Sequence, residues 1–408
     1  AAAAAATTTT TSTDTSTVVV VEETANITDT ASTASFAPTI SSSFVADSRN
    51  NSNSSINTPT AVGSCFHERG KSGKWVLDWD YGNRSSYVVR GTYTDWHFAS
   101  QSFRPTPQQP SRLAASYRWD DDICPVHEVT RDKFCHVCET LNVSKILILG
   151  DSLSAEFGMS LLSLLRQDFP VAFQPLFKRW HPVTCDNSDG TTSIVHFRLY
   201  RRSPLSDMLT LGDDLQLKSI IANSIDRTVI VANTGLWIPT FEEYKTAFGA
   251  LLDYIDSFPP DKIIPFIRPS IPGHPNCKPR PDLDKAQHGE ELKKFDWVNK
   301  TVDEVPFEDI QAYRDYTNQQ NGSQTYNWLN LERYNDYSYG MLKNRTAATA
   351  ATNSTTEIHW FDIFPSAILR RDGHIGFQDC LHYYLPGPVD WWSHLFFSKL
   401  VDMAEVTR

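Results

Sequence analysis

Short apolar runs that end abruptly in glycine and polar residues constrain the fold of this chain more than any other feature of its sequence. Residues 146–149 (Ile-Leu-Ile-Leu) form a run typical of a strand buried on both faces of a parallel sheet, and Gly150-Asp151-Ser152 ends it. Apolar residues then recur at helical spacing over 153–165, which predicts a helix with one buried stripe. The segment therefore predicts a strand, a tight turn and a helix.

The same pattern repeats further along the chain. Apolar runs over 228–232 and 262–267 each end in polar residues, and a helical pattern over 241–255 lies between them. The core pattern resumes at 358–363 and closes with a C-terminal helix near 391–406. Such alternation predicts a three-layer α/β/α fold with a central parallel sheet, helices on both faces, and active groups at the carboxyl ends of the strands.

The other segments differ in composition. Residues 1–62 are rich in Ala, Thr and Ser and bury too little apolar surface to offset their chain entropy, which predicts a disordered stalk open to O-glycosylation. Residues 63–140 are rich in Trp, Tyr and Gly and predict an irregular N-terminal subdomain held by aromatic packing and disulfides. We expect 141–408 to form the α/β domain, with a polar surface insertion at about 276–357 that is helical near 286–299.

Charge and hydropathy exclude several classes of protein. The formal net charge is -11 and the acidic residues are scattered, so we expect no nucleic-acid partner, whereas a neutral polar ligand such as a glycan fits. The sequence contains no run of about 18 apolar residues, the length that a membrane-spanning helix needs. The sequence begins at Ala1 without a methionine, from which we expect a signal peptide or membrane anchor upstream of residue 1.

Sequons and cysteines indicate the secretory pathway. The Asn-x-Ser/Thr sequons gather in the stalk and in 299–355, and they begin at Asn26, Asn50, Asn53, Asn83, Asn142, Asn299, Asn321, Asn344 and Asn353. Of the seven cysteines, most would pair in an oxidising compartment and one would be left over. Cys135 and Cys138 also fit half of a zinc site, but no second ligand pair has matching spacing, so we expect no metal.

Ser152 is the candidate nucleophile. It lies where the apolar strand turns into the helix, so free backbone N–H groups and the positive end of the helix dipole would favour an oxyanion beside it. Gly150 allows a tight turn, and Asp151 is a good helix cap. Taken alone, the triplet is more often a capped turn without chemistry.

Asp379 and His382 are the candidates for a base and the carboxylate that orients it. A serine hydroxyl needs a base at neutral pH, imidazole suits that task, and one short loop would supply both groups. A solvent-facing Asp and a packed His are the alternative. His274, which follows the third strand, and His374 are further candidates for the base, and His274 could instead line the cleft.

Three more residues follow strand ends and could contact substrate. The Asn233 side-chain amide and the Gly235 N–H are suitable oxyanion donors, although Asn-Thr-Gly is also an ordinary turn. The planar guanidinium of Arg268 could hold a substrate oxygen.

Four sequence blocks resemble those of the trichome birefringence-like family, within the wider group of SGNH-type serine esterases and acyltransferases. The blocks are Tyr117-Arg118-Trp119 before Cys124, Gly150-Asp151-Ser152, Asn233-Thr234-Gly235-x-Trp237, and Asp379-Cys380-Leu381-His382 continuing to Leu385-Pro386-Gly387. They occur in the family's order, and the resemblance covers roughly residues 63–406.

This resemblance implies an SGNH-hydrolase-like fold, with 141–408 as the catalytic domain, and a triad of Ser152, His382 and Asp379. Asn233 would be an oxyanion donor by analogy. The implied activity is O-acetyl transfer to polysaccharide or glycan hydroxyls through an acyl-serine intermediate, from a donor such as acetyl-CoA and with no permanently bound cofactor. The implied location is the Golgi lumen, behind a type II membrane anchor, or outside the cell.

Three positions depart from the family's pattern. Ala155 stands in place of the usual Arg, Leu236 in place of a His, and Tyr384 in place of a Cys, which fits the odd number of cysteines. These departures keep a secreted carbohydrate acetylesterase open as the alternative. A glycan-binding cell-wall protein on an esterase-like scaffold is the alternative of a different class. The aromatic residues that would stack on sugars in that case are Trp75, Trp79 and Trp96.

Overall fold

The structure is a computed structural model, and it describes most of the chain beyond the predicted stalk. The described residues are 62–84, 113–165, 180–186, 190–201, 213–274, 306–319, 328–352, 356–376, 379–383 and 385–407. All of them belong to one compact unit, Thr58–Arg408. The predicted stalk up to residue 61, the predicted helix near 286–299 and Trp96 lie outside the described residues.

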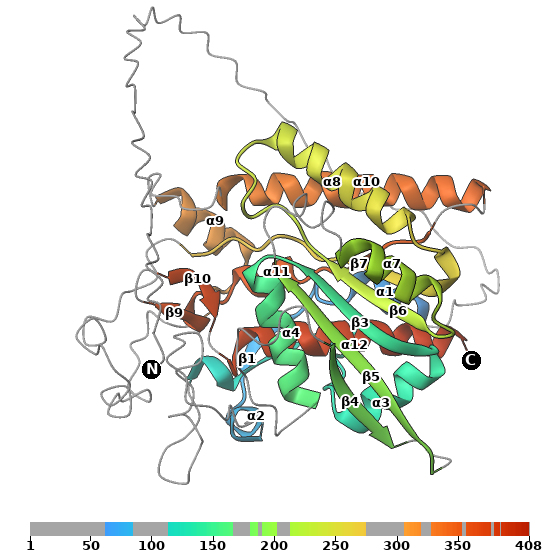
Figure 1. The fold of residues 1–408 in the computed structure, drawn as a ribbon. Helices are drawn as coiled ribbons and strands as arrows, with labels where there is room; N and C mark the ends of the chain where they lie inside the picture. The colour runs from blue at the N-terminus through green and yellow to red at the C-terminus, as the bar shows by residue number, and fades with distance from the viewer. Residues whose placement is uncertain are drawn as a thin grey trace, which may run out of the picture. The chain divides into compact units, whose positions relative to one another are not determined.

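A six-stranded sheet lies at the centre of the described residues (Figure 1). Its strands, in their order across the sheet, are β4 Trp180–Asp186, β5 Thr192–Arg201, β3 Val143–Gly150, β6 Arg227–Ala232, β7 Ile263–Ile267 and β8 His359–Trp360. Neighbouring strands from β5 to β8 run parallel, and β4 pairs with β5 in the antiparallel sense. The α/β class is confirmed, but the sheet is mixed and mostly parallel instead of purely parallel.

The antiparallel pair β4 and β5 is absent from the elements that the sequence predicts. In β5 the side chains of Val195, Phe197 and Leu199 are buried, so every second residue faces the core. That alternation is a strand signal, but it lies among polar residues and differs from the all-apolar runs of β3 and β6. The antiparallel strand β4 covers the edge of β5 that β3 leaves open.

Helices cover both faces of the sheet. They are α1 Val62–Glu68, α2 Trp79–Arg84, α3 Arg131–Thr140, α4 Ser152–Leu165, α7 Asp213–Ala222, α8 Phe241–Asp256, α9 Ile310–Gln319, α10 Trp328–Thr352, α11 Phe364–Ile368 and α12 Pro388–Thr407. Figure 1 shows α8 beside α10 above the sheet, whereas α4 packs against α12 on the other side. None of the helices in the described segments has the length and apolar character to cross a membrane.

Two small sheets flank the central one. β1 Lys74–Leu77 pairs with β2 Tyr117–Asp120, and β9 His374–Gly376 pairs with β10 Asp379–Tyr383, both in the antiparallel sense. The first lies in the predicted N-terminal subdomain. The second carries the predicted base, His382.

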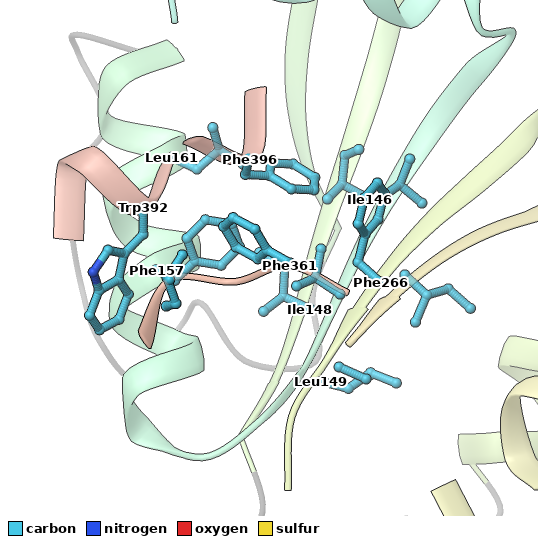
Figure 2. Packing of buried hydrophobic residues seen from close by; sticks show 14 of the residues in the cluster. Ile146, Ile148, Leu149, Phe157, Leu161, Phe266, Phe361, Trp392 and Phe396 are labelled. Atoms are coloured by element: carbon cyan, nitrogen blue, oxygen red, sulfur yellow. The ribbon is translucent and has the colours of Figure 1, made fainter. Parts of the chain in front are cut away.

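Aromatic and aliphatic side chains fill the space between the sheet and the helices α4 and α12 (Figure 2). The side chains labelled on this face are Ile146 and Ile148 of β3, Phe157 and Leu161 of α4, Phe266 of β7, Phe361, and Trp392 and Phe396 of α12, whereas Leu149, next to Ile148 in β3, points to the opposite face of the sheet. The ring of Phe396 lies 5.5 Å from that of Phe157. Helix α12 packs against α4, and nearly every side chain of α4 is buried. The expectation of a single buried stripe on this helix is therefore wrong.

The aromatic N-terminal segment packs onto α12. The indole N–H of Trp75 donates to the carbonyl of Ser366 at 2.8 Å, and the Trp75 ring lies 6.2 Å from that of Trp391. Arg69 forms a buried ion pair with Asp402 of α12 at 2.6 Å. The aromatic contacts and the short strands agree with the prediction, whereas the helices α1, α2 and α3 are not predicted, and the segment shares its core with the α/β sheet.

Disulfides tie distant parts of the sequence together. They join Cys65 to Cys124 and Cys135 to Cys185, and Cys380 is also disulfide-bonded. Within the described segments Cys138 is a free cysteine, and its burial raises the pKa of the thiol and keeps it unreactive. The prediction of paired cysteines with one left over agrees with these bonds. The zinc alternative is wrong, because Cys135 is bonded to another cysteine.

Helix α10 is the largest element that the sequence does not predict. The polar composition of 276–357 predicts a surface insertion, whereas the ring of Tyr334 in α10 stacks on that of Tyr244 in α8 at 4.2 Å. Its buried positions recur every three or four residues, and they are Trp328, Leu331, Tyr334, Asn335, Ser338 and Leu342. This spacing is a helical signal, but aromatic and polar residues carry it, so a count of aliphatic residues misses it.

A buried neutral histidine makes this fold sensitive to acid. His394 of α12 accepts a hydrogen bond from the Val129 N–H at Nδ1, so its Nε2 carries the ring proton and faces the Tyr81 hydroxyl, each at 3.1 Å. Burial lowers the pKa of His394 to about 3. At a pH between about 6.5, the ordinary pKa of histidine, and about 3, His394 binds a proton in the unfolded chain but not in the folded chain. The stability that depends on neutral His394 is therefore complete above about pH 6.5 and is lost as the pH falls.

We expect protonation of His394 in the unfolded chain to lower the free energy of unfolding by about 2 kcal/mol between about pH 7 and about pH 5. His394→Asn can still accept the Val129 N–H but cannot titrate. The variant should be less stable at neutral pH and should lose less stability in acid. Urea unfolding of both proteins across this pH range measures the difference, and equal losses in the two proteins would contradict the assignment.

Candidate active site

The carboxyl ends of β3 and β6 meet at one edge of the sheet. From β3 the chain continues to β4 and β5 on one side and then to β6 on the other, so the order of strands reverses between β3 and β6. Ligands of open α/β sheets bind at such a switch point. Gly150 ends β3, and Asn233 follows β6 and donates its backbone N–H to the Leu149 carbonyl at 3.0 Å. Gly150 and Asn233 therefore lie close together at this edge.

The turn between β3 and α4 requires glycine and places Ser152 at the first position of the helix. Gly150 has a φ of 152°, and a Cβ atom there would lie 2.5 Å from Oγ of Ser154 and 3.0 Å from the carbonyl oxygen of Asn233. Asp151 caps the helix, because its Oδ1 accepts the Ser154 N–H at 3.0 Å. Ser152 therefore lies beside the positive end of the α4 dipole.

His382 contacts the candidate nucleophile directly. Its Nε2 lies 2.7 Å from Oγ of Ser152, although the two residues are 230 positions apart in the chain. A neutral His382 with its ring proton on Nδ1 accepts the Ser152 hydroxyl proton at Nε2, which is the geometry that general-base activation of a serine needs. Ser152 is 2% exposed and His382 is 9% exposed, so the contact is shielded from bulk water.

Asp379 begins the strand that carries His382. The pairing of β10 with β9 is irregular between Asp379 and Tyr383, and such irregularities redirect side chains at functional sites. The side chain of Asp379 lies outside the described residues, so its role as the partner of His382 stays a prediction.

Arg268 supports the turn that carries Ser152. Its Nη2 donates to Oδ1 of Asp151 at 3.1 Å and to Oγ of Ser154 at 2.8 Å, and its Nη1 donates to the Pro269 carbonyl at 3.0 Å. The Arg268 side chain is fully buried, and burial lowers the pKa of its guanidinium while Asp151 raises it. These bonds give Arg268 a positioning role inside the protein. To hold a substrate oxygen, as predicted, Arg268 would need a further N–H donor besides those that bind Asp151, Ser154 and Pro269.

The Asn233 amide is committed within the protein. Its Nδ2 donates to the Arg268 carbonyl at 3.2 Å and to Oγ of Ser270 at 3.1 Å, so an oxyanion role would require one of these bonds to open. Gly235 has a φ of 139°, and a Cβ atom there would lie 2.7 Å from the Ser270 hydroxyl. Gly235 therefore allows the β6 loop to approach Ser270 closely.

A polar stripe on α4 faces the C-terminal segment, and sequence reasoning does not find it. Ser152, Glu156 and Ser160 lie four residues apart, one above another on the helix. Glu156 accepts the Tyr383 N–H at 3.3 Å, and Ser160 donates to Asp390 at 2.6 Å. Glu156 therefore holds the strand that carries His382 against the helix that carries Ser152, whereas Ser160 binds α4 to α12. Polar residues at this spacing in an otherwise apolar helix are the signal that could have revealed it.

The other two histidines considered as bases are engaged elsewhere. His274 is fully buried, with Nδ1 facing Nε2 of His374 and Nε2 lying 2.6 Å from the Ile368 carbonyl. Nδ1 of His374 lies 3.0 Å from the carbonyl of His382. The structure therefore brings His382 into contact with Ser152, whereas His274 and His374 contact each other and the backbone of His382.

The proposed sugar-stacking residues differ in exposure. Trp75 is half-buried, and its ring makes edge contacts with Trp119 and Trp391. Trp79 is 40% exposed. Trp237, which is not one of the proposed residues and follows Gly235 in the loop after β6, is 46% exposed. Among the described residues, no group of three or more His, Cys, Asp or Glu side chains is arranged to hold a metal ion.

No family model, curated protein or solved structure matches this chain. The α/β class and its mixed, mostly parallel sheet therefore rest on the chain's own structure. The resemblance to the trichome birefringence-like family rests on the sequence blocks quoted above.

Proposed function

We propose that this chain is a serine O-acyltransferase that moves acetyl groups to glycan or polysaccharide hydroxyls through an acyl-Ser152 intermediate. The observation that carries the proposal is the 2.7 Å contact between Oγ of Ser152 and Nε2 of His382 at the N-terminus of α4. A nucleophile, a base and a helix N-terminus then meet at the sheet edge where open α/β sheets bind ligands.

In the first half-reaction Ser152 takes the acetyl group from the donor. His382 removes the hydroxyl proton as Oγ attacks the acetyl carbonyl, and the negative charge that forms on the carbonyl oxygen is favoured by the N-terminal end of α4. His382 then gives that proton to the leaving group, which for a thioester such as acetyl-CoA is a thiol. Ser152 is left as an acetyl ester and His382 is neutral again.

In the second half-reaction His382 removes a proton from a sugar hydroxyl, which attacks the acetyl-serine carbonyl. Collapse of the tetrahedral intermediate releases Oγ of Ser152, and His382 returns the proton to it. A water molecule in the place of the sugar would give free acetate and make the same site an esterase.

Shielding of the site favours transfer over hydrolysis. Bulk water is present at about 55 M, so a transferase has to hold the sugar hydroxyl at a high effective concentration and keep water from the acyl carbon. Ser152 and His382 are both at least nine-tenths buried, which supports exclusion of water. Trp237, exposed on the loop after β6, offers an aromatic face for a sugar.

We expect acetylated oligosaccharide to exceed free acetate when the protein receives acetyl-CoA together with glycan oligosaccharides. Mass spectrometry of the products measures both, and the same mixture with Ser152→Ala gives the uncatalysed background. If every acceptor leaves only acetate and pre-acetylated glycans are stripped, the protein is the alternative, a secreted carbohydrate acetylesterase. If acetyl-Ser152 never forms and oligosaccharides only bind, the glycan-binding alternative holds.

The proposed compartment is the Golgi lumen, with attachment to the membrane, or the outside of the cell. The disulfides Cys65–Cys124 and Cys135–Cys185 support an oxidising compartment, because such bonds do not persist in the cytosol. The sequons support the same pathway.

A further inference from the structure

Two buried histidines form a hydrogen-bonded chain that ends on the backbone of His382. His274 directs Nε2 at the Ile368 carbonyl, 2.6 Å away, and its Nδ1 faces Nε2 of His374. Nδ1 of His374 lies 3.0 Å from the His382 carbonyl, and the His374 ring stacks on Tyr383 at 4.3 Å. Two imidazole rings therefore bridge the carbonyl of Ile368, the last residue of α11, to the backbone of the proposed base.

The three hydrogen bonds made by His274 and His374 need one proton more than two neutral imidazoles carry. A backbone carbonyl only accepts hydrogen bonds, so Nε2 of His274 and Nδ1 of His374 both have to carry a proton. The contact between the rings needs a third proton, but two neutral rings hold only two. With two protons, the remaining nitrogens would face each other as two lone pairs at hydrogen-bond distance.

We propose that the His274 and His374 pair holds one extra proton, on His374, and that it positions His382 by binding its backbone carbonyl. His374 then donates from both ring nitrogens, and neutral His274 accepts one of these bonds and donates to Ile368. Burial lowers the pKa of His274 to about 4, in keeping with a neutral ring at that position. The kinetic consequence rests on the function proposed above, whereas the proton count does not.

Charged groups around the pair come from two elements. Asp372 raises the pKa of His274 and Arg371 lowers it, after the larger effect of burial. Asp372 is itself bound to Arg370 at 2.8 Å, and both side chains are fully buried, so their charges largely cancel. Glu156 of α4 is also buried, and it accepts the backbone N–H of Tyr383, whose ring stacks on His374, at 3.3 Å.

Two tyrosines also face the pair. The Tyr313 ring lies 5.5 Å from that of His274, and Tyr383 stacks on His374. Burial raises the pKa of Tyr313 to about 12 and raises that of Tyr383 well above its ordinary value, so both phenols stay neutral. A cation on His374 thus has an aromatic face on one side and hydrogen-bond acceptors at both of its nitrogens.

The extra proton links the alignment of His382 to pH. While His374 donates to the His382 carbonyl, β10 keeps Nε2 of His382 against Ser152. Loss of the proton at high pH leaves no hydrogen between the two rings. One of the three hydrogen bonds that link Ile368, His274, His374 and His382 then has to break. Turnover should therefore have an alkaline limb in addition to the acid limb that a histidine base produces.

Nitrogen-15 NMR of histidine-labelled protein at about pH 7.5, where exposed imidazoles are mostly neutral, tests the proton count without any assay of activity. We expect one ring with protons on both nitrogens in the folded wild type, and we expect Ser152→Ala to keep this signal. His374→Asn should lose it. If every histidine ring of the wild type carries a single proton, the proposal is overturned.

Two substitutions of His374 separate positioning from simple structural loss. His374→Asn keeps an N–H near the position of Nδ1, so it still reaches the His382 carbonyl, whereas His374→Gln keeps one near Nε2 and loses that bond. We expect kcat to fall about tenfold further in His374→Gln than in His374→Asn, with KM little changed, and the alkaline limb to be absent from His374→Asn. Equal kcat values in the two variants, or an alkaline limb that persists in His374→Asn, would overturn the positioning role. Absence of acetyl transfer in the wild type would refute the proposed function and leave the NMR result to decide the proton count.

Discussion

Ser152→Ala is expected to lower turnover of a small acetyl ester on the order of 10⁴-fold, while the free energy of unfolding changes by less than about 1 kcal/mol. The substitution removes only the hydroxyl group, whose Oγ lies 2.7 Å from Nε2 of His382. Without Oγ no acetyl-enzyme can form, and the helix N-terminus and the binding surface account for the residual rate. Steady-state assays with 4-nitrophenyl acetate and mass spectrometry of the intact protein, which detects acetylation of Ser152, measure the loss.

Ser160→Ala is the matched control, because it makes the same change in the same helix two turns further on. Ser160 is buried and donates to Asp390 at 2.6 Å, so its loss should lower stability and leave the acetylation step in place. His382→Ala should lower turnover about as much as Ser152→Ala does. The double variant should lose no more, since the losses caused by removing members of one catalytic unit are not additive. Full turnover in Ser152→Ala, or a comparable loss in Ser160→Ala, would contradict a serine mechanism at this site.

The sequence predicts the parts of the fold that depend on local pattern. The runs 146–149, 228–232 and 262–267 form β3, β6 and β7, and helices follow where the apolar spacing places them. The contact between Ser152 and His382 is also within reach of sequence reasoning, because Gly150-Asp151-Ser152 ends a strand and the Asp379 block supplies a histidine at a fixed spacing. Chemistry-bearing residues at strand ends identify the site without knowledge of the full topology.

What the sequence does not predict depends on contacts between distant segments. The burial of nearly every side chain of α4 depends on its packing against α12, and the role of α10 depends on aromatic stacking on α8. A periodicity argument sees one helix at a time and cannot show which neighbour covers its outer face. Likewise, Arg268 follows a strand end as a substrate-binding residue would, and only its contacts show that its guanidinium serves Asp151 and Ser154.

Arg268→Met is expected to lower the free energy of unfolding by about 3–5 kcal/mol, because it leaves the Asp151 carboxylate buried without a positive charge beside it. The ion pair measures 3.1 Å, and its side chains are 0% and 4% exposed. Met keeps most of the volume of the Arg side chain, so the loss reports the unpaired charge more than a cavity. The turn that carries Ser152 should also loosen, since Asp151 caps α4 and Arg268 binds Ser154 as well.

The surface pair of Arg314 and Glu332 provides the control, because its side chains are 48% and 40% exposed. Arg314→Met should cost less than about 1 kcal/mol, as exposed ion pairs do. Adding Asp151→Asn to Arg268→Met removes the stranded charge, so the double variant should recover part of the stability but not the activity, because the turn still lacks the Arg268 bonds. Urea unfolding and acetyl ester turnover, measured on the same four proteins, separate the two effects. A loss in Arg268→Met as small as that in Arg314→Met would show that Asp151 finds another partner, and the turn would then hold Ser152 without Arg268.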